Sequence, residues 1–174
     1  DLKHPTYNHI SQLRNLNDRY LITHLNENER GKGFIRIEYS NIEIEQLIRN
    51  NEIVIAKENN EIIGYYLIGK TTNNPSLLYQ SKEGKIWAGQ NKIPFENIGY
   101  GCQVCIDEGH RNNGLFASML NELCVKVKQK YSHLLCSISE TNPDSLQAHV
   151  NNGWKEISTS GPTRFFIYTI KQQN

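Results

Sequence analysis

The segment His110–Gly114 places one arginine, two asparagines and a glycine directly before an apolar run that begins at Leu115. A helix starting here would leave its first amides unpaired and carry roughly half a positive charge at its N-terminus. Glycine and asparagine tolerate positive φ, so an anion can approach such amides closely. The segment therefore suits a phosphate, to which Arg111 could add a charge-assisted hydrogen bond. A solvated loop whose asparagine merely caps the helix explains the same residues, and the spacing leaves both interpretations open.

A second candidate region begins at Asn142. The order Asn142-Pro143 is typical of a helix start, with asparagine as N-cap and proline as the first helical residue. His149 lies on the same expected helix, and its ordinary pKa of about 6.5 suits proton donation near neutral pH. A histidine that packs in the core or bonds to backbone is the alternative for this position.

The four cysteines are expected to be small buried side chains. Cys102 and Cys105 are three residues apart on an expected strand, where such residues point to opposite faces. They cannot bind one metal ion together, and we expect no metal site.

The composition predicts one compact domain spanning residues 1–174, because 174 residues with 37% hydrophobic content can bury one sizeable core. The net charge of +1 gives no long-range field that would gather nucleic acid or anionic lipid. No apolar run approaches the roughly 20 residues of a membrane helix, and the first residues lack a signal-peptide core. We therefore expect a cytoplasmic location and neither a nucleic-acid nor a membrane partner.

The first part of the chain shows helical and strand periodicities in turn. Apolar residues at helical spacing predict an amphipathic helix from Asn8 to about Asn26, continuous or broken in two. Phe34–Tyr39 alternates with period two and predicts a strand. A short helix should follow, capped by Ser40 or Asn41.

Two β-rich runs, Ile53–Lys57 and Ile62–Gly69, surround an Asn-Asn pair and predict an antiparallel hairpin. The next stretch, Thr71–Asn97, contains prolines and glycines and has no lasting period. We expect it to be a long loop of the kind that often covers a substrate.

The second half of the chain alternates strands and helices. Ile98–Ile106 predicts a strand whose glycines, Gly99 and Gly101, indicate a bulge or a close backbone approach. A helix should begin near Asn113, and further elements are expected at Leu134–Ser139 (strand), from Asn142 (helix), and at Trp154–Thr159 and Arg164–Ile170 (strands). The strand-helix-strand unit predicts a parallel pair. The fold class is therefore α/β with a mixed, mostly antiparallel sheet.

The order D-E-G-H-R-N-N-G-L-F, on a strand-to-helix junction, resembles motif A of the GNAT superfamily of acyl-CoA N-acyltransferases, [QR]-x-x-G-x-[GA]. Arg111 and Gly114 match that motif. The downstream order N-P-D-S-L-Q-A-H-V-N-N-G-W is similar to motif B of the same superfamily. Either motif alone is weak, whereas the pair in this order, separated by a strand, is much more specific. The motif B places are filled by Asn142, Ser145, His149, Gly153 and Trp154.

The resemblance implies a single-domain fold whose central parallel strands splay apart to hold acetyl-CoA or another acyl-CoA, with no metal. It also implies which residues bind this co-substrate. The pyrophosphate would lie on the amides of Arg111, Asn112, Asn113, Gly114, Leu115 and Phe116. The pantetheine would run beside Val104, Cys105 and Ile106, and Asn142 and Ser145 would also contact the cofactor.

Two residues depart from the family pattern. Phe116 stands where motif A usually has glycine or alanine, and the apolar stripe of its helix offers it a role as a core anchor. His149 stands where the family commonly has a tyrosine that protonates the departing CoA thiolate. A histidine can donate that proton as well, so we predict His149 as the general acid.

In an N-acyltransferase the acceptor amine would attack the thioester directly, because one cleft holds both reactants. Cys102 or Cys105 as a covalent nucleophile ranks low, since neither has an identifiable histidine and acid partner. The general base is not identified by the sequence, and the candidates near the motifs are Tyr100, Asp107, Glu108 and Glu140.

Two alternatives stay open: a non-catalytic acyl-CoA-binding or regulatory module on the same fold, and an α/β domain whose Arg111 loop holds a different phosphate ligand or is merely a connection. The acceptor of an enzyme would be a small-molecule or peptide amine. The N-terminal helices and Thr71–Asn97 would recognise it. A homodimer is compatible with the sequence, which does not determine the oligomeric state.

Overall fold

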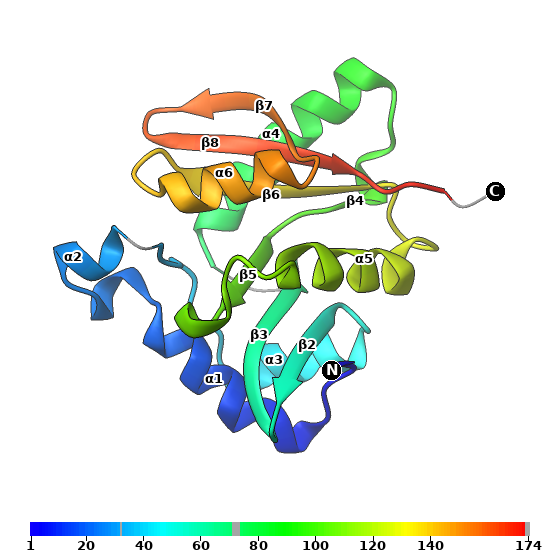
Figure 1. The fold of residues 1–174 in the computed structure, drawn as a ribbon. Helices are drawn as coiled ribbons and strands as arrows, with labels where there is room; N and C mark the ends of the chain where they lie inside the picture. The colour runs from blue at the N-terminus through cyan, green and yellow to red at the C-terminus, as the bar shows by residue number, and fades with distance from the viewer. Residues whose placement is uncertain (32, 71–73, 173–174) are drawn as a thin grey trace.

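The computed structural model describes residues 1–31, 33–70 and 74–172, whose arrangement is shown in Figure 1. Its helices are α1 (Ile10–Arg19), α2 (Glu27–Arg30), α3 (Asn41–Arg49), α4 (Ser76–Asn91), α5 (Leu115–Val127) and α6 (Pro143–Asn151). Its strands are β1 (Leu2–Lys3), β2 (Ile53–Glu58), β3 (Glu61–Ile68), β4 (Ile98–Gly99), β5 (Cys102–Ile106), β6 (His133–Ser139), β7 (Lys155–Ser160) and β8 (Thr163–Thr169). Short 3-10 helices occupy Tyr7–His9, Ile22–His24, Phe95–Asn97 and Glu108–His110.

The strands form two four-stranded sheets, in the orders β1-β2-β3-β5 and β4-β6-β8-β7. The first sheet is antiparallel throughout. The second contains the parallel pair β4 and β6, in which Ile98 lies opposite His133 and Gly99 opposite Leu134. Beyond Gly99 the chain leaves β6, and β5 pairs with β3 instead. The central strands therefore splay apart, which confirms the predicted α/β fold with mixed pairing.

Gly101 marks the point where the predicted strand Ile98–Ile106 divides into β4 and β5. Its φ is +79°, a conformation that side chains rarely adopt. The Gly69 amide donates to the Gly101 carbonyl at 2.8 Å. A Cβ on Gly101 would lie 2.9 Å from the Gly69 carbonyl carbon. The predicted close backbone approach is confirmed, and it redirects the strand from one sheet to the other.

Helices cover both faces of the two sheets (Figure 1). On one face, α5 packs its apolar stripe against β2, β3 and β6, with Met119, Leu123 and Val127 fully buried. On the other face, α1 and α3 cover the first sheet and α4 covers the second. Neighbouring residues of β2 alternate between the two cores, so Val54 faces α5 while Ile53 faces α1 and α3. The strands are buried on both sides, as in other α/β folds.

Two short-range predictions are confirmed by backbone detail. Ser40 caps α3, and its side chain accepts from the Glu43 amide while the Glu43 carboxylate accepts from the Ser40 amide. Asn59 and Asn60, both with positive φ, connect β2 to β3. Two successive positive φ values give the turn whose twist matches that of a hairpin.

The predicted strand Phe34–Tyr39 is wrong. This segment is extended, but its only strand-like contact among the described residues is an isolated bridge between Ile35 and Leu21. The buried side chain of Asn17 replaces a neighbouring strand, because its amide nitrogen donates to the Ile37 carbonyl and its oxygen accepts from the Tyr39 amide. The alternation of apolar and polar residues correctly predicted an extended backbone. It could not predict which groups would satisfy the hydrogen bonds of that backbone.

The predicted loop Thr71–Asn97 is also wrong, apart from residues 71–73, which lie outside the described residues. It contains α4, a helix of 16 residues. The buried positions of α4 are Leu77, Gln80, Gly84 and Ala88, which share one face at helical spacing. A stripe made largely of glutamine, glycine and alanine gives no apolar periodicity, so the helix was invisible to pattern analysis.

The predicted helix from Asn8 to about Asn26 is broken, as one of the two alternatives had it. α1 ends at Arg19 because Tyr20 turns its carbonyl to the Ile35 amide, at 2.9 Å, instead of continuing the helix. Among the described residues, no helix has the length and apolar character needed to cross a membrane.

Candidate functional site

A cleft of about 390 Å³ opens where β5 and β6 splay apart. One wall is the β5 segment Cys102–Val104 and the facing wall is the β6 segment Cys136–Ser139. The extended segment Phe34–Ile37 closes one side. Residues of α4 and α6, among them Gln80 and His149, and the β7–β8 residues Ser160, Thr163 and Phe165 complete the lining. Segments far apart in the sequence thus meet around one cavity.

The edge of β5 that faces this cleft is not paired with another strand. The Asp107 amide donates to the Ile63 carbonyl, so alternate residues such as Cys105 turn their backbone groups toward β3. Val104 and Ile106 therefore turn theirs away from β3. The Ile106 carbonyl already accepts from the Arg111 side chain at 2.8 Å. Val104 thus presents a backbone donor and acceptor to the cleft.

The three β5 residues predicted to lie beside the pantetheine, Val104, Cys105 and Ile106, consequently differ in position. Val104 lines the cleft. The Cys105 side chain lies on the opposite face, in the core beneath α1, where its Sγ is 3.9 Å from the Leu16 carbonyl oxygen. Cys102 belongs to the other core, which confirms that these two cysteines point to opposite faces.

The start of α5 is open and rich in unpaired amides. Gly114 is its N-cap residue with φ +84°, and a Cβ there would meet no atom within 4 Å. The Ser118 amide donates to the Gly114 carbonyl at 3.1 Å, and the Leu115 amide donates to the side-chain oxygen of Asn113 at 3.3 Å. Within the part of the chain that the structure describes, the amides of residues 116 and 117 have no partner, as expected for a first helical turn. This surface can bind an anion.

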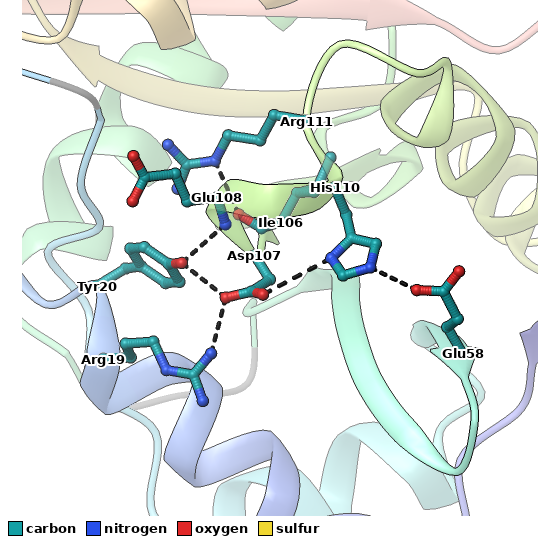
Figure 2. Close-up of polar contacts among 8 residues, drawn as sticks. All are labelled: Arg19, Tyr20, Glu58, Ile106, Asp107, Glu108, His110 and Arg111. Carbon is teal, nitrogen blue, oxygen red and sulfur yellow. Dashed lines mark hydrogen bonds and ion pairs between the residues drawn. The ribbon is translucent and has the colours of Figure 1, made fainter.

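The Arg111 side chain is engaged within the protein. Besides the bond from its Nε to Ile106, its guanidinium carbon lies 4.9 Å from the centre of the Tyr20 ring. Figure 2 shows this guanidinium group beside Tyr20 and Glu108. The Arg111 side chain therefore joins the loop to Tyr20 at the end of α1.

Asn142 is the N-cap residue of α6 and Pro143 opens the helix, as predicted, but the Asn142 side chain makes no cap hydrogen bond. Its Nδ2 donates to the Phe34 carbonyl at 3.0 Å, across the cleft. Its Oδ1 is buried and has no hydrogen-bond partner among the described residues. Asn142 therefore holds the wall Phe34–Ile37 against α6.

His149 is buried between two aromatic rings, those of Phe116 and Trp154, with ring centres 5.0 and 5.3 Å away. Its Nδ1 donates to the Ser145 carbonyl at 2.7 Å. Burial lowers the pKa of His149 from 6.5 to about 4. The imidazole is therefore neutral near pH 7, with Nδ1 protonated and Nε2 holding a lone pair. Phe116 also contacts the Tyr66 ring, which fits the predicted packing role.

Gln80, on α4, was missed by the sequence analysis. Its Oε1 accepts from the Gly101 amide at 2.7 Å and its Nε2 donates to Ser137 Oγ at 2.8 Å. Gly101 begins the β5 side of the cleft and Ser137 belongs to β6, so one buried amide bridges the two splayed strands. A polar residue predicted to lie in a loop gave no signal of this role.

Comparisons with known proteins agree with this geometry. Residues 12–154 match the model of the family described as "Acetyltransferase (GNAT) family". The chain belongs to the GNAT acetyltransferase family. The match contains the open start of α5, the edge of β5 and the helix α6, and it confirms the resemblance drawn from the two motifs.

Solved structures share the GNAT fold at low sequence identity. An N-acetyltransferase from Staphylococcus aureus Mu50 has 16% identity and a TM-score of 0.65, with 98% of each chain covered. The protein yncA from Salmonella typhimurium, solved with its cofactor acetyl-CoA, has 11% identity and a TM-score of 0.64, with 99% of this chain and 95% of that chain covered. A ribosomal-protein-alanine N-acetyltransferase from Brucella melitensis has 14% identity and a TM-score of 0.63, with 97% and 99% covered. No curated protein matches the sequence.

The four candidate bases of this GNAT member do not meet in the cleft. Asp107 lies outside it, where hydrogen bonds and charge from Tyr20 and Arg19 outweigh the effect of burial and lower its pKa. Tyr100 stacks on Phe95 at 5.8 Å between ring centres. Glu108 and Glu140 do not line the cleft either. Across residues 1–31, 33–70 and 74–172 no carboxylate lines it, and no cluster of His, Cys, Asp or Glu could hold a metal ion.

The two cysteines that line the cleft are poor nucleophiles. Burial raises the pKa of the Cys102 thiol, and that of the Cys136 thiol, well above the ordinary value. Cys105, outside the cleft, has a pKa raised by burial to about 12. Since the thiolate is the reactive form, these groups give little support to a covalent acyl-enzyme.

Proposed function

We propose that this GNAT member is an N-acetyltransferase that moves the acetyl group of acetyl-CoA to a primary amine of a small-molecule or peptide acceptor. One observation carries the proposal: β5 presents its unpaired edge to the cleft at Val104, and the chain continues from this strand to the start of α5, where the amides of residues 116 and 117 have no partner among the described residues. The first suits an extended amide-bearing chain such as pantetheine, and the second suits a pyrophosphate. We also propose that residues 1–174 form one cytoplasmic domain.

In this proposal the backbone binds the cofactor. The pyrophosphate lies on the loop and first turn of α5, whose residues are Arg111, Asn112, Asn113, Gly114, Leu115 and Phe116. The pantetheine pairs with Val104 along β5, beside the neighbouring residues Cys105 and Ile106. The buried and unpartnered Oδ1 of Asn142 supports a polar contact near the cofactor, and Ser145 lies one turn further along α6.

The transfer proceeds by direct attack. The free amine nitrogen forms a bond to the thioester carbon, the carbon-sulfur bond breaks, and CoA leaves as a thiolate that takes up a proton. The Val104 amide, which points away from β3, can stabilise the charge that develops on the thioester oxygen. The Gly101 amide is not available for this task, because it donates to Gln80. With no carboxylate in the described lining, the ammonium proton leaves through water.

His149 as general acid remains a prediction. Donation from Nε2 requires the imidazolium form, which a pKa of about 4 makes rare at neutral pH. The alternative is that His149 positions Ser145 and Phe116. Replacing His149 with phenylalanine should leave acetyl-CoA affinity unchanged if His149 is the acid, and should lower it if His149 positions these two cofactor-binding residues. A fall in kcat of roughly 100-fold would support the acid, and an unchanged kcat would refute it.

Two measurements test the proposed function. Acetyl-CoA at 100 times its Kd should raise the free energy of unfolding by about 2.7 kcal/mol, which a thermal shift detects. Release of free CoA thiol should then depend on added amine. A protein whose melting temperature acetyl-CoA does not change would contradict the proposal. Acetylated protein that accumulated without an acceptor would contradict direct transfer.

A non-catalytic acyl-CoA-binding module is the second candidate, favoured by the absence of a carboxylate from the described cleft lining and by the low pKa of His149. It predicts the same thermal stabilisation by acetyl-CoA. It differs in predicting no amine-dependent thiol release across amino acids, peptides, amino sugars and polyamines.

A further inference from the structure

The loop that precedes α5 is held from outside the cleft by five side chains, which we call the loop anchor: Arg19, Tyr20, Glu58, Asp107 and His110 (Figure 2). They come from the end of α1, the β2–β3 hairpin and the loop itself. None of them lines the cleft. The loop anchor therefore holds the loop from outside the cleft, through contacts within the protein.

Tyr20 is the central member of the loop anchor. Its hydroxyl donates to Asp107 Oδ1 at 2.7 Å and accepts from the Glu108 amide at 2.8 Å. Arg19 Nη1 donates to the same Asp107 oxygen at 2.7 Å. These bonds fix the orientation of the peptide between Asp107 and Glu108, the first peptide after β5. Because the chain reaches α5 only a few residues later, this orientation limits where the α5 amides can point.

The far end of the short 3-10 helix Glu108–His110 is held as well. The guanidinium group of Arg111 packs over the Tyr20 ring. His110 Nε2 donates to Glu58 Oε2 at 2.5 Å, and its Nδ1 lies 3.6 Å from Asp107 Oδ2. Tyr20 thus contacts the loop on both sides of this 3-10 helix, at the Glu108 amide and at the Arg111 side chain.

The backbone of Tyr20 holds a different part of the site. Its carbonyl accepts from the Ile35 amide at 2.9 Å, and the Ile35 carbonyl accepts from the Ile22 amide at 2.9 Å. Ile35 belongs to the wall Phe34–Ile37 of the cleft. One residue therefore links the loop before α5, through its side chain, to the cleft wall, through its main chain.

We propose that Tyr20 is a positioning residue for acetyl-CoA, whose hydroxyl sets the loop so that the amides of α5 face the pyrophosphate. This inference rests on the proposed function. It assigns a role in cofactor affinity to the end of α1, a region without either family motif.

The test compares two acetyl donors. Tyr20→Phe keeps the ring under Arg111 and removes only the hydroxyl. Acetyl-CoA affinity, measured by calorimetry, should fall roughly tenfold, the usual effect of losing a hydrogen bond to a charged group. Acetyl transfer from S-acetylpantetheine, which lacks the pyrophosphate, should keep its kcat/KM. Tyr7→Phe is the matched control, because it removes a hydroxyl from a tyrosine that is 56% exposed and lies before α1, outside the loop anchor.

A second variant guards against misfolding. Asp107→Asn keeps the shape of the partner and weakens its bond to Tyr20, so it should lower acetyl-CoA affinity by a similar factor. The double variant should lose no more than either single one, since both act through one contact. Unchanged affinity in Tyr20→Phe, or an equal loss with both donors, would overturn the inference while leaving the proposed function intact. Wild-type protein that fails to bind acetyl-CoA would refute both.

Arg36 supports an independent inference about the acceptor. It is the one charged residue that lines the described cleft, on the wall Phe34–Ile37. Its guanidinium carbon lies 5.8 Å from the centre of the Phe34 ring, which also lines the cleft. Among the described residues no carboxylate forms an ion pair with Arg36. A guanidinium group placed on an aromatic ring with two donors in a plane is well suited to a carboxylate.

We infer that the acceptor carries a carboxylate as well as its amine, as free amino acids and short peptides do. This also rests on the proposed function. A polycationic amine would meet a positive charge and no compensating carboxylate in the described lining, so it is disfavoured.

The test uses acceptors in matched pairs. With saturating acetyl-CoA, free amino acids and dipeptides should be acetylated with a kcat/KM at least about tenfold above that of their carboxamides, and above that of spermidine. Arg36→Gln should abolish this preference without changing the KM for acetyl-CoA. Arg49→Gln removes a guanidinium group from the surface of α3 and is the control. Equal rates with acids and carboxamides would overturn the inference, while thiol release with no amine at all would refute the proposed function itself.

Discussion

Helices α5 and α6 both begin where a strand of the splayed pair ends, yet their first turns are built in opposite ways. α5 starts at an exposed glycine with positive φ, and its first amides are unpaired. α6 starts at a buried asparagine followed by proline, and the asparagine side chain reaches across to the Phe34 carbonyl. One helix start offers backbone donors to a ligand, while the other uses a side chain to hold the cleft wall.

The difference shows that a helix start becomes a ligand site through what its neighbours leave uncovered. The loop before α5 is fixed by side chains outside the cleft, so its inner side stays open. The start of α6 is covered by the segment Phe34–Ile37, and its polar groups are buried there. The two helix starts therefore predict different responses to substitution.

The largest effect is expected at the start of α5. Gly114→Glu should weaken acetyl-CoA binding by roughly 100-fold or more, because a carboxylate would lie beside the pyrophosphate. Glutamate at φ +84° should cost about 1–2 kcal/mol of backbone strain, but its Cβ meets no atom within 4 Å, so the fold should survive. Gly114→Asn is the control, because asparagine tolerates positive φ and adds no charge. Calorimetric titration with circular dichroism decides the outcome, and an unchanged affinity would contradict the pyrophosphate placement.

An effect of comparable size, on stability and not on binding, is expected at His149 in α6. Its pKa is about 4 in the folded protein and 6.5 when unperturbed, so between these values only the unfolded state takes up the proton. The stability present above pH 6.5 is thus lost as the pH falls toward 4, by about 3 kcal/mol. Urea unfolding of wild type and His149→Gln across this range should show that the variant lacks this component. Exposed His24→Gln should keep it, and parallel curves for wild type and His149→Gln would contradict the burial argument.

The smallest effects compare the two asparagines at the helix starts. Asn142→Ala should cost about 1–3 kcal/mol of unfolding free energy, because it leaves the buried Phe34 carbonyl without a donor. Asn113→Ala should cost less than about 0.5 kcal/mol, since its side chain is exposed and its bond to the Leu115 amide is long, at 3.3 Å. Equal costs, measured by urea unfolding, would remove the distinction between the two starts.

Local signals in the sequence were sufficient for much of the fold. The hairpin at Asn59 and Asn60 and the cap at Ser40 were predicted because each depends on residues within a few positions of one another. The helix α4 was missed because its buried stripe contains Gln80 and Gly84, which pattern analysis counts as polar or flexible. The segment Phe34–Tyr39 was misread because its hydrogen bonds go to Asn17, and no local pattern encodes so distant a partner.

The candidate site divides in the same way. The motifs pointed to the start of α5 and to the region of His149, because glycine, asparagine and histidine carry their chemistry in their type and spacing. The side-chain environments could not be read in advance. Arg111 turns to Tyr20, Asn142 reaches Phe34, and burial lowers the pKa of His149, and each of these depends on residues distant in the chain.

By itself the sequence determined the family, the order of most elements and the loop whose amides can bind a phosphate. Each of these features depends on residues that are close together in the sequence, and so it does not depend on where the segment lies in the fold. Only the tertiary structure decided which strand edge stays unpaired, which amide bridges β5 to β6, and whether His149 carries a charge. Those outcomes depend on packing between distant segments, because burial and hydrogen-bond partners are set by the surroundings that folding brings together.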